Sequence, residues 1–161
     1  MEQEHAARIE SLCRLIDEAF DGVVLGDGIG LWEAQGLDDM DDAETCANLR
    51  AKDEKEDWRK ISYEDLNICF SSPGFLDAPG MRFHLPAFLI AELRNELGLE
   101  FHYRLLNFNY HDIERYSMLN SKQRLVVRAF LLFLGEWCSN RSEILRELAE
   151  YWTEESCRSV I

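Results

Sequence analysis

Arg82 and His84 are the side chains whose types and positions most clearly suggest chemistry. They lie in the stretch 70–97, just before Pro86, and proline is favoured as the first residue of a helix because its missing N–H has no partner there. An apolar stripe then predicts a helix from Pro86 to residue 97, ended by Gly98. Backbone N–H groups and the helix dipole favour an anion at a helix N-terminus. A small-anion sensor at Arg82 and His84 is therefore one hypothesis.

A purely structural interpretation of the same two residues stays open. Arg82 can pair with one of the many carboxylates, and His84 can satisfy a backbone group where the helix begins. The preceding residues 71–80 are rich in Ser, Pro and Gly, which predicts a compact ordered loop.

A second hypothesis is metal-assisted hydrolysis. Asp27, Glu54, Asp57 and His84 could converge with Arg82 to supply acid and base groups around a divalent ion. The spacing of an EF-hand loop is absent, as are the H-x-x-x-H and H-E-x-x-H pairs of zinc enzymes. The G-D-G-I-G string lacks the lysine of a P-loop. We therefore expect no cofactor, and the sequence leaves metal binding undefined.

The elements that must position these residues are predicted to be helices. Apolar spacing predicts helices over 9–20, 43–58, 86–97 and 121–138, and a last one from Asn140 or Ser142. The helix 121–138 is apolar around most of its circumference, so we expect it to be buried at the centre. Residues 21–42 predict a packed loop, and 99–105 the only extended segment. The predicted fold is one mainly α domain, 1–161, of five to six helices with long ordered loops and at most a minor β element.

Charge is concentrated at the front of the chain. The formal charge is −14, and residues 1–65 contain 7 Lys and Arg against 19 Asp and Glu, a net of −12. Such a surface repels nucleic acid and anionic lipid and attracts a basic protein. The leading hypothesis is therefore a binding or regulatory protein, antitoxin-like or immunity-like, that engages a protein partner with a basic surface. Excess acid can also serve only to keep a protein soluble.

Cysteine usage and hydropathy bear on the compartment. The five cysteines are odd in number and form no C-x-x-C pair, which suits a reducing environment. No apolar run approaches the ~20 residues of a membrane-spanning helix, and the charged N-terminus does not have the pattern of a secretory signal. We expect a cytoplasmic protein.

Several segments resemble the motif series of a family of bacterial proteins of unknown function. They are G-D-G-I-G-L-x-E-A-x-G-L-D-D at 26–39, D-E-x-x-D-W at 53–58, G-M-R-F-H-L-P-A-F at 80–88 and L-N-S-K-Q-R at 119–124. The resemblance spans most of the chain and implies no particular activity. It singles out seven candidate binding residues without assigning roles to them: Asp27, Asp53, Glu54, Asp57, Trp58, Arg82 and His84.

Overall fold

A computed structural model describes residues 1–159 of the chain. These residues form nine α-helices and three short 3₁₀ helices, and no strand occurs among them. The mainly α class is confirmed, although the number of helices exceeds the five to six predicted. The backbone groups into two compact units, which are considered separately below.

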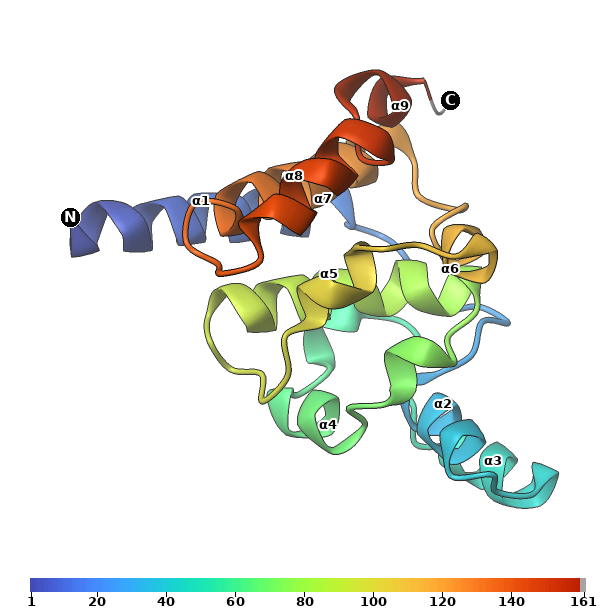
Figure 1. Cartoon of the computed structure of the whole chain (residues 1–161). Helices are drawn as coiled ribbons and strands as arrows, with labels where there is room; N and C mark the ends of the chain where they lie inside the picture. The colour runs from blue at the N-terminus through green and yellow to red at the C-terminus, as the bar shows by residue number, and fades with distance from the viewer. Residues whose placement is uncertain (160–161) are drawn as a thin grey trace. The chain divides into compact units, whose positions relative to one another are not determined.

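The first unit comprises residues 1–21, 102–108 and the described chain from Leu119 onward. Its α-helices are labelled in Figure 1 and are α1 (Glu2–Ala19), α7 (Ser121–Leu134), α8 (Arg141–Glu150) and α9 (Glu154–Arg158). The 3₁₀ helix η3 (Phe101–Leu105) also belongs to it except for its first residue. Residues 99–105, predicted to be extended, therefore contain a 3₁₀ helix instead.

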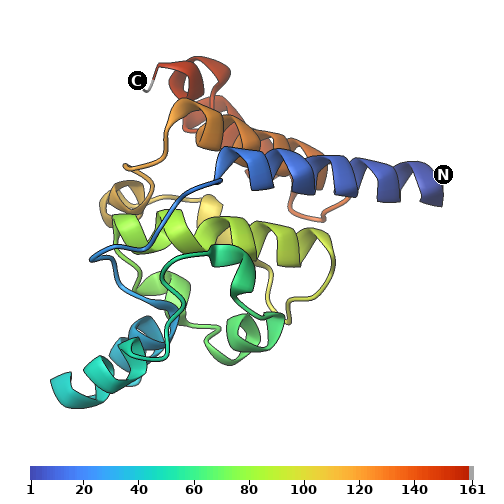
Figure 2. The same cartoon turned by 180° about the vertical axis from the view of Figure 1, so that it is seen from behind.

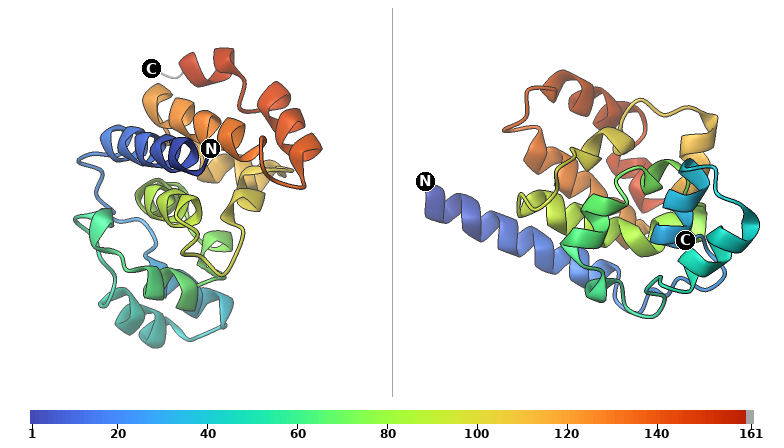
Figure 3. Two further views of the ribbon diagram at one scale, coloured as in Figure 1. Left: turned by 90° about the vertical axis from the view of Figure 1, so that its left-hand side faces the viewer. Right: turned by 90° about the horizontal axis from the view of Figure 1, so that it is seen from below.

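Helix α7 is the packing centre of the first unit, because α1, α8 and α9 all lie against it. The view along α1 in Figure 3 (left) shows α1 and α7 side by side. Val127, Phe130 and Leu131 of α7 are fully buried, as the sequence predicted for this helix. Trp137 was predicted to be buried with them, but α7 ends at Leu134 and the Trp137 side chain is exposed.

Arg124 is a second departure from the prediction for α7. A charged residue on such a helix is expected on its solvent side, yet the Arg124 side chain is buried. Its guanidinium carbon lies 4.9 Å from the ring centroids of both Tyr151 and Trp152. Stacking on aromatic faces compensates part of the cost of taking the cation out of water.

The second unit comprises residues 22–101 and 109–118. Its elements in chain order are α2 (Leu31–Asp38), α3 (Ala43–Arg50), η1 (Trp58–Lys60), α4 (Tyr63–Ile68), η2 (Ser72–Gly74), α5 (Ala78–Leu93) and α6 (Tyr110–Arg115). Helices α2 and α3 form an antiparallel pair, and η1 and α6 contact the long helix α5 (Figure 2). Helix α2 lies in the segment predicted to be a loop, because four glycines masked its short apolar pattern.

Helix α5 begins at Ala78 and not at Pro86, so the prediction for its start was wrong. The Asp77 carboxylate accepts a hydrogen bond from the Gly80 N–H at 2.9 Å and caps the helix, and a proline fills the first turn. Pro86 lies inside the helix, where it has no N–H to offer the carbonyl four residues earlier.

Arg82 and His84 consequently lie within α5 and not before it. The anion position that the sequence predicted for them, in front of a helix N-terminus, does not exist at these residues. Side chains two residues apart on a helix point in nearly opposite directions, so those of Arg82 and His84 do not converge either.

The predicted helix 43–58 was also too long. Helix α3 ends at Arg50, and residues 51–57 form turns before η1. Arg50, Asp53, Glu54 and Asp57 therefore do not share one helix face. Arg50 and Asp53 contact α2 instead, and Glu54 accepts a hydrogen bond from the Asp57 N–H. Asp42 does begin α3, as predicted, and its side chain accepts a hydrogen bond from the Thr45 N–H at 2.8 Å.

Across residues 1–159, none of the helices combines the length and the apolar content needed to cross a membrane.

Candidate functional site

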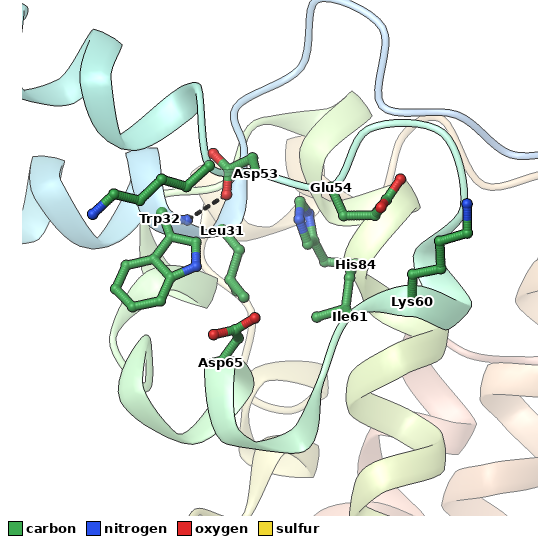
Figure 4. A pocket seen from close by; sticks show the side chains of 9 residues that line it. Leu31, Trp32, Asp53, Glu54, Lys60, Ile61, Asp65 and His84 are labelled. Carbon is green, nitrogen blue, oxygen red and sulfur yellow. Dashed lines mark hydrogen bonds between the residues drawn. The ribbon is translucent and has the colours of Figure 1, made fainter.

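The second unit contains a cavity of about 210 Å³ (Figure 4). It is lined by Leu31, Trp32, Lys52, Asp53, Glu54, Lys60, Ile61, Asp65 and His84. These residues come from α2, from η1 and the segments on either side of it, from α4 and from α5. The cavity thus brings together three of the seven residues that the sequence singled out, namely Asp53, Glu54 and His84.

His84 is the most unusual group in this cavity. The residue is 1 % exposed, and its Nδ1 atom lies 2.7 Å from the Gly80 carbonyl oxygen, one turn earlier on α5. A carbonyl oxygen can only accept, so Nδ1 donates and the neutral ring presents a lone pair at Nε2. Nε2 is buried and has no hydrogen-bond partner. Burial lowers the pKa of His84 from 6.5 to about 4, against the opposing effect of the Gly80 bond, so the ring is neutral near pH 7.

Asp53 anchors the beginning of α2 to the cavity wall. Its Oδ1 accepts a hydrogen bond from the Trp32 N–H at 2.7 Å, and its Oδ2 accepts one from the Glu33 N–H at 3.3 Å. The carboxyl is 7 % exposed, and burial raises its pKa, an effect that the two N–H donors oppose. A Cβ on Gly30 would lie 1.9 Å from Asp53 Oδ2, so only glycine permits this approach.

Glu54 organises the turn that follows. Its Oε1 accepts hydrogen bonds from the backbone N–H groups of Lys55, Glu56 and Asp57 at 2.9–3.1 Å. These donors lower the pKa of the Glu54 carboxyl, those of Glu56 and Asp57 most strongly. Three converging donors fix one edge of the cavity in place.

The remaining wall consists of residues that the sequence did not single out. Trp32 lies flat along one side with its indole nitrogen toward the cavity, and the Asp65 carboxylate faces it (Figure 4). The Lys52 ammonium lies 5.5 Å from the Trp32 ring centroid. Lys60 is exposed at the opposite end. Trp32, Asp65 and Lys60 are far apart in the sequence and share no local pattern, so the sequence alone could not show that they line one cavity.

The other four predicted residues do not line the cavity. Asp27 is exposed in the loop before α2, and Arg82 lies on α5 away from the cavity. Asp57 caps η1 by accepting a hydrogen bond from the Arg59 N–H at 3.1 Å. Trp58 is buried, with the Arg59 guanidinium 4.7 Å from its ring centroid. The contacts of Asp57 and Trp58 are those of residues that shape the fold.

Metal-ligating side chains do not gather at this site. Within residues 1–159 there is no group of three or more His, Cys, Asp and Glu side chains arranged to hold a metal ion. Asp27, Glu54, Asp57 and His84, the set predicted for metal-assisted hydrolysis, do not converge. The geometry therefore gives that hypothesis no support.

Comparison with known proteins gives the chain a family. The model of a family of unknown function, DUF6714, matches residues 8–156. The chain belongs to this family. Neither curated proteins nor solved structures gave a significant match. The expected resemblance to a family of unknown function is confirmed, and the function of this DUF6714 member has to be argued from its own geometry.

Three of the four segments that suggested the resemblance surround the cavity of this DUF6714 member. Segment 26–39 contributes Leu31 and Trp32, segment 53–58 contributes Asp53 and Glu54, and segment 80–88 contributes His84. The fourth, 119–124, lies in the first unit.

Arg50, the last residue of α3, holds the first of these segments in place. Its Nη1 donates to the Gly28 carbonyl oxygen and, at 2.7 Å, to Glu33 Oε2, and its Nη2 donates to the Gly26 carbonyl oxygen at 3.0 Å. The fork of one guanidinium thus fixes the glycine loop ahead of α2 and one side of α2 itself. The cavity wall is preorganised by this contact and by Asp53.

Proposed function

We propose that this DUF6714 member is a binding protein whose ligand is a small polar molecule held in the cavity at His84. The observation that carries the proposal is the buried His84 Nε2 atom, which has no hydrogen-bond partner. A buried polar group without a partner costs about 1–3 kcal/mol, and folded proteins rarely tolerate this without a reason. A ligand that donates a hydrogen bond to Nε2 recovers that cost.

The geometry limits what the ligand can be. A volume of about 210 Å³ is below the ~300 Å³ at which pockets for drug-sized molecules begin, so the ligand is small. It must carry an N–H or O–H donor, because Nε2 offers only a lone pair. Nε2 is screened from water, so binding also requires a small shift of a lining side chain.

Binding of a small polar donor explains His84 better than metal-assisted hydrolysis or a small-anion sensor does. An imidazole whose pKa is lowered to about 4 is a weak general base at neutral pH. A lone pair at Nε2 also repels an anion, so His84 does not suit a small-anion sensor.

A thermal-unfolding screen with small polar molecules tests the proposal. A ligand at a hundred times its dissociation constant adds about 2.7 kcal/mol of stability. We expect molecules that stabilise the wild-type chain to lose this effect in His84→Asn, in which the amide keeps a donor for the Gly80 carbonyl but has no atom in the place of Nε2. Stabilisation that is equal in both chains would overturn the proposal.

A protein partner with a basic surface is the second candidate, and the turn between α2 and α3 favours it. Met40 is 91 % exposed there, between the exposed carboxylates of Asp39, Asp41 and Asp42. An exposed apolar side chain surrounded by like charges is suited to a partner with a pocket rimmed by Lys and Arg. Capture from the native lysate should weaken at high salt and in Met40→Ser, while capture that ignores both changes would contradict this candidate.

A further inference from the structure

The charged groups around the cavity differ between its interior and its rim. In the interior, Asp65 has a carboxylate that makes no hydrogen bond or ion pair within residues 1–159. The oxygens of Asp53 and one oxygen of Glu54 are already bonded to backbone N–H groups. The acceptors left for a ligand are therefore the Asp65 carboxylate, the second carboxylate oxygen of Glu54 and the lone pair of His84 Nε2.

Unused acceptors that include carboxylates select a particular kind of donor. A protonated amine carries three N–H donors, no acceptor and a positive charge. It can satisfy Nε2 and the Asp65 carboxylate together, and the carboxylate contributes a charge-assisted bond. An amide or a hydroxyl offers donors without the charge, so it forms no charge-assisted bond with the carboxylate, although its oxygen can accept a hydrogen bond from the Trp32 indole N–H. The interior therefore prefers a cationic nitrogen.

The rim has the opposite sign. Lys52 and Lys60 are exposed, and neither ammonium group is in an ion pair within the described chain. Lys52 lines the cavity with its ammonium 5.5 Å from the Trp32 ring centroid, and Lys60 lies on the far side of the cavity from Trp32 in Figure 4. A ligand carboxylate at the opening is attracted by either ammonium group. An amine without a carboxylate is not attracted by them, and a divalent metal ion is repelled.

We infer that the ligand is a small zwitterion, with a protonated amine directed at His84 Nε2 and Asp65 and a carboxylate directed at Lys52 or Lys60. This rests on the proposed function, because it names the ligand class for the same cavity. The indole face of Trp32 and the side chains of Leu31 and Ile61 form the apolar walls along which the carbon chain between the two charges lies.

Four probes of matched length test the charge requirement on the intact chain. They are γ-aminobutyrate, butylamine, butyrate and butyramide, which present both charges, the cation alone, the anion alone and a neutral donor. Titrations by calorimetry and by NMR of histidine labelled at its ring nitrogens report affinity and contact with Nε2. We expect γ-aminobutyrate to bind most tightly, butylamine roughly tenfold more weakly, and butyrate not at all.

Variants assign each charge to a side chain. Asp65→Asn should weaken γ-aminobutyrate and butylamine by roughly tenfold each, and Glu64→Gln, on the same helix but outside the cavity, should change neither. The double variant Lys52→Met with Lys60→Met should reduce the affinity of γ-aminobutyrate to that of butylamine and leave butylamine unchanged.

The possible outcomes separate the ligand class from the proposed function. Butyramide binding as tightly as γ-aminobutyrate, with a shift at Nε2, would overturn the zwitterion and leave the binding site standing. Tight binding of butyrate would likewise overturn it. If none of the four probes binds or shifts the His84 ring nitrogens, the zwitterion and the binding function at Nε2 both fail.

Discussion

The Nδ1 atom of His84 donates to the Gly80 carbonyl oxygen at 2.7 Å, and this single contact determines what the imidazole can do. It fixes the proton on Nδ1 and the ring orientation, and so leaves Nε2 as a lone pair at the cavity. The same arrangement prepares histidines in many binding sites, where a backbone carbonyl selects the tautomer of the ring. The predictions below follow from this contact and from the residues that hold the cavity wall.

Replacing His84 by leucine should not destabilise the chain. Leucine has a similar volume, and it removes a buried polar atom that has no partner. We expect the free energy of unfolding to rise by about 1 kcal/mol while ligand binding is lost. Urea unfolding measures the first effect, and calorimetry the second.

His102→Leu is the matched control for that substitution. His102 is equally buried, but its Nε2 atom lies 3.0 Å from Asn140 Nδ2. Leucine there removes a hydrogen-bonded ring and leaves a polar partner behind, so unfolding should become easier by about 1 kcal/mol or more. Equal losses of stability at both positions would mean that His84 is an ordinary core histidine.

His84 should also make stability depend on pH. Its pKa is about 4 in the folded chain and near 6.5 when unfolded, so the unfolded state binds more protons between these values. Stability contributed by the neutral ring is complete above pH 6.5 and falls as the pH drops toward 4, by about 3 kcal/mol in total. The free energy of unfolding, measured at several pH values, should change less with pH in His84→Leu than in the wild-type chain over this window. An equal change with pH in the two chains would refute the lowered pKa of His84.

Asp53 and Gly30 should behave as a coupled pair. Asp53→Asn can keep only one of the two backbone donors of α2, so we expect a loss of about 1–3 kcal/mol of unfolding free energy. Gly30→Ala should cost at least as much, because the new Cβ would collide with the Asp53 carboxylate. Asp53→Ala removes that carboxylate, so Gly30→Ala should destabilise the Asp53→Ala variant much less than it destabilises the wild-type chain. A double-mutant cycle measures this difference. Gly98→Ala, whose Cβ would meet Asn67 at 3.4 Å, serves as a mild control, and additive losses at positions 30 and 53 would argue against the contact.

Arg50→Lys should loosen the loop ahead of α2. Lysine has one nitrogen in place of the fork that reaches Gly26, Gly28 and Glu33, so we expect about 1–2 kcal/mol of destabilisation and faster amide exchange in residues 26–30. Arg158→Lys, which changes an exposed pair with Glu154, should have almost no effect. Unchanged exchange in the loop of Arg50→Lys would show that the fork does not hold it.

The sequence predicted the long helices well, because burial imposes a periodic pattern on them. Helices α1 and α7 follow such stripes, and α7 begins at its predicted first residue, although α1 begins at Glu2 and not at residue 9 and α7 ends at Leu134 and not at residue 138. The start of α5 was harder, since both Pro79 and Pro86 satisfy the rule for a first-turn proline. The side-chain cap from Asp77 to Gly80 decides between them, and spacing alone could not show that it forms.

The site was predicted only in part, for a physical reason. His84, Asp53 and Glu54 were noticed as unusual residue types within short motifs, but their roles depend on contacts across the sequence. Asp53 reaches back to the N–H groups at the start of α2, 20 and 21 residues earlier. Trp32 and Asp65 have no local pattern that marks them, and they become wall residues only because the folded chain brings residues of α2, α4 and α5 to one cavity.

Nitrogen NMR of the His84 ring, with histidine isotopically labelled, tests the central claim most directly. Near neutral pH and without ligand, we predict a protonated Nδ1 and an unprotonated Nε2, and addition of γ-aminobutyrate should move the Nε2 resonance in the direction of a hydrogen-bonded acceptor. A ring that carries its proton on Nε2, or that is doubly protonated near neutral pH, would contradict the account.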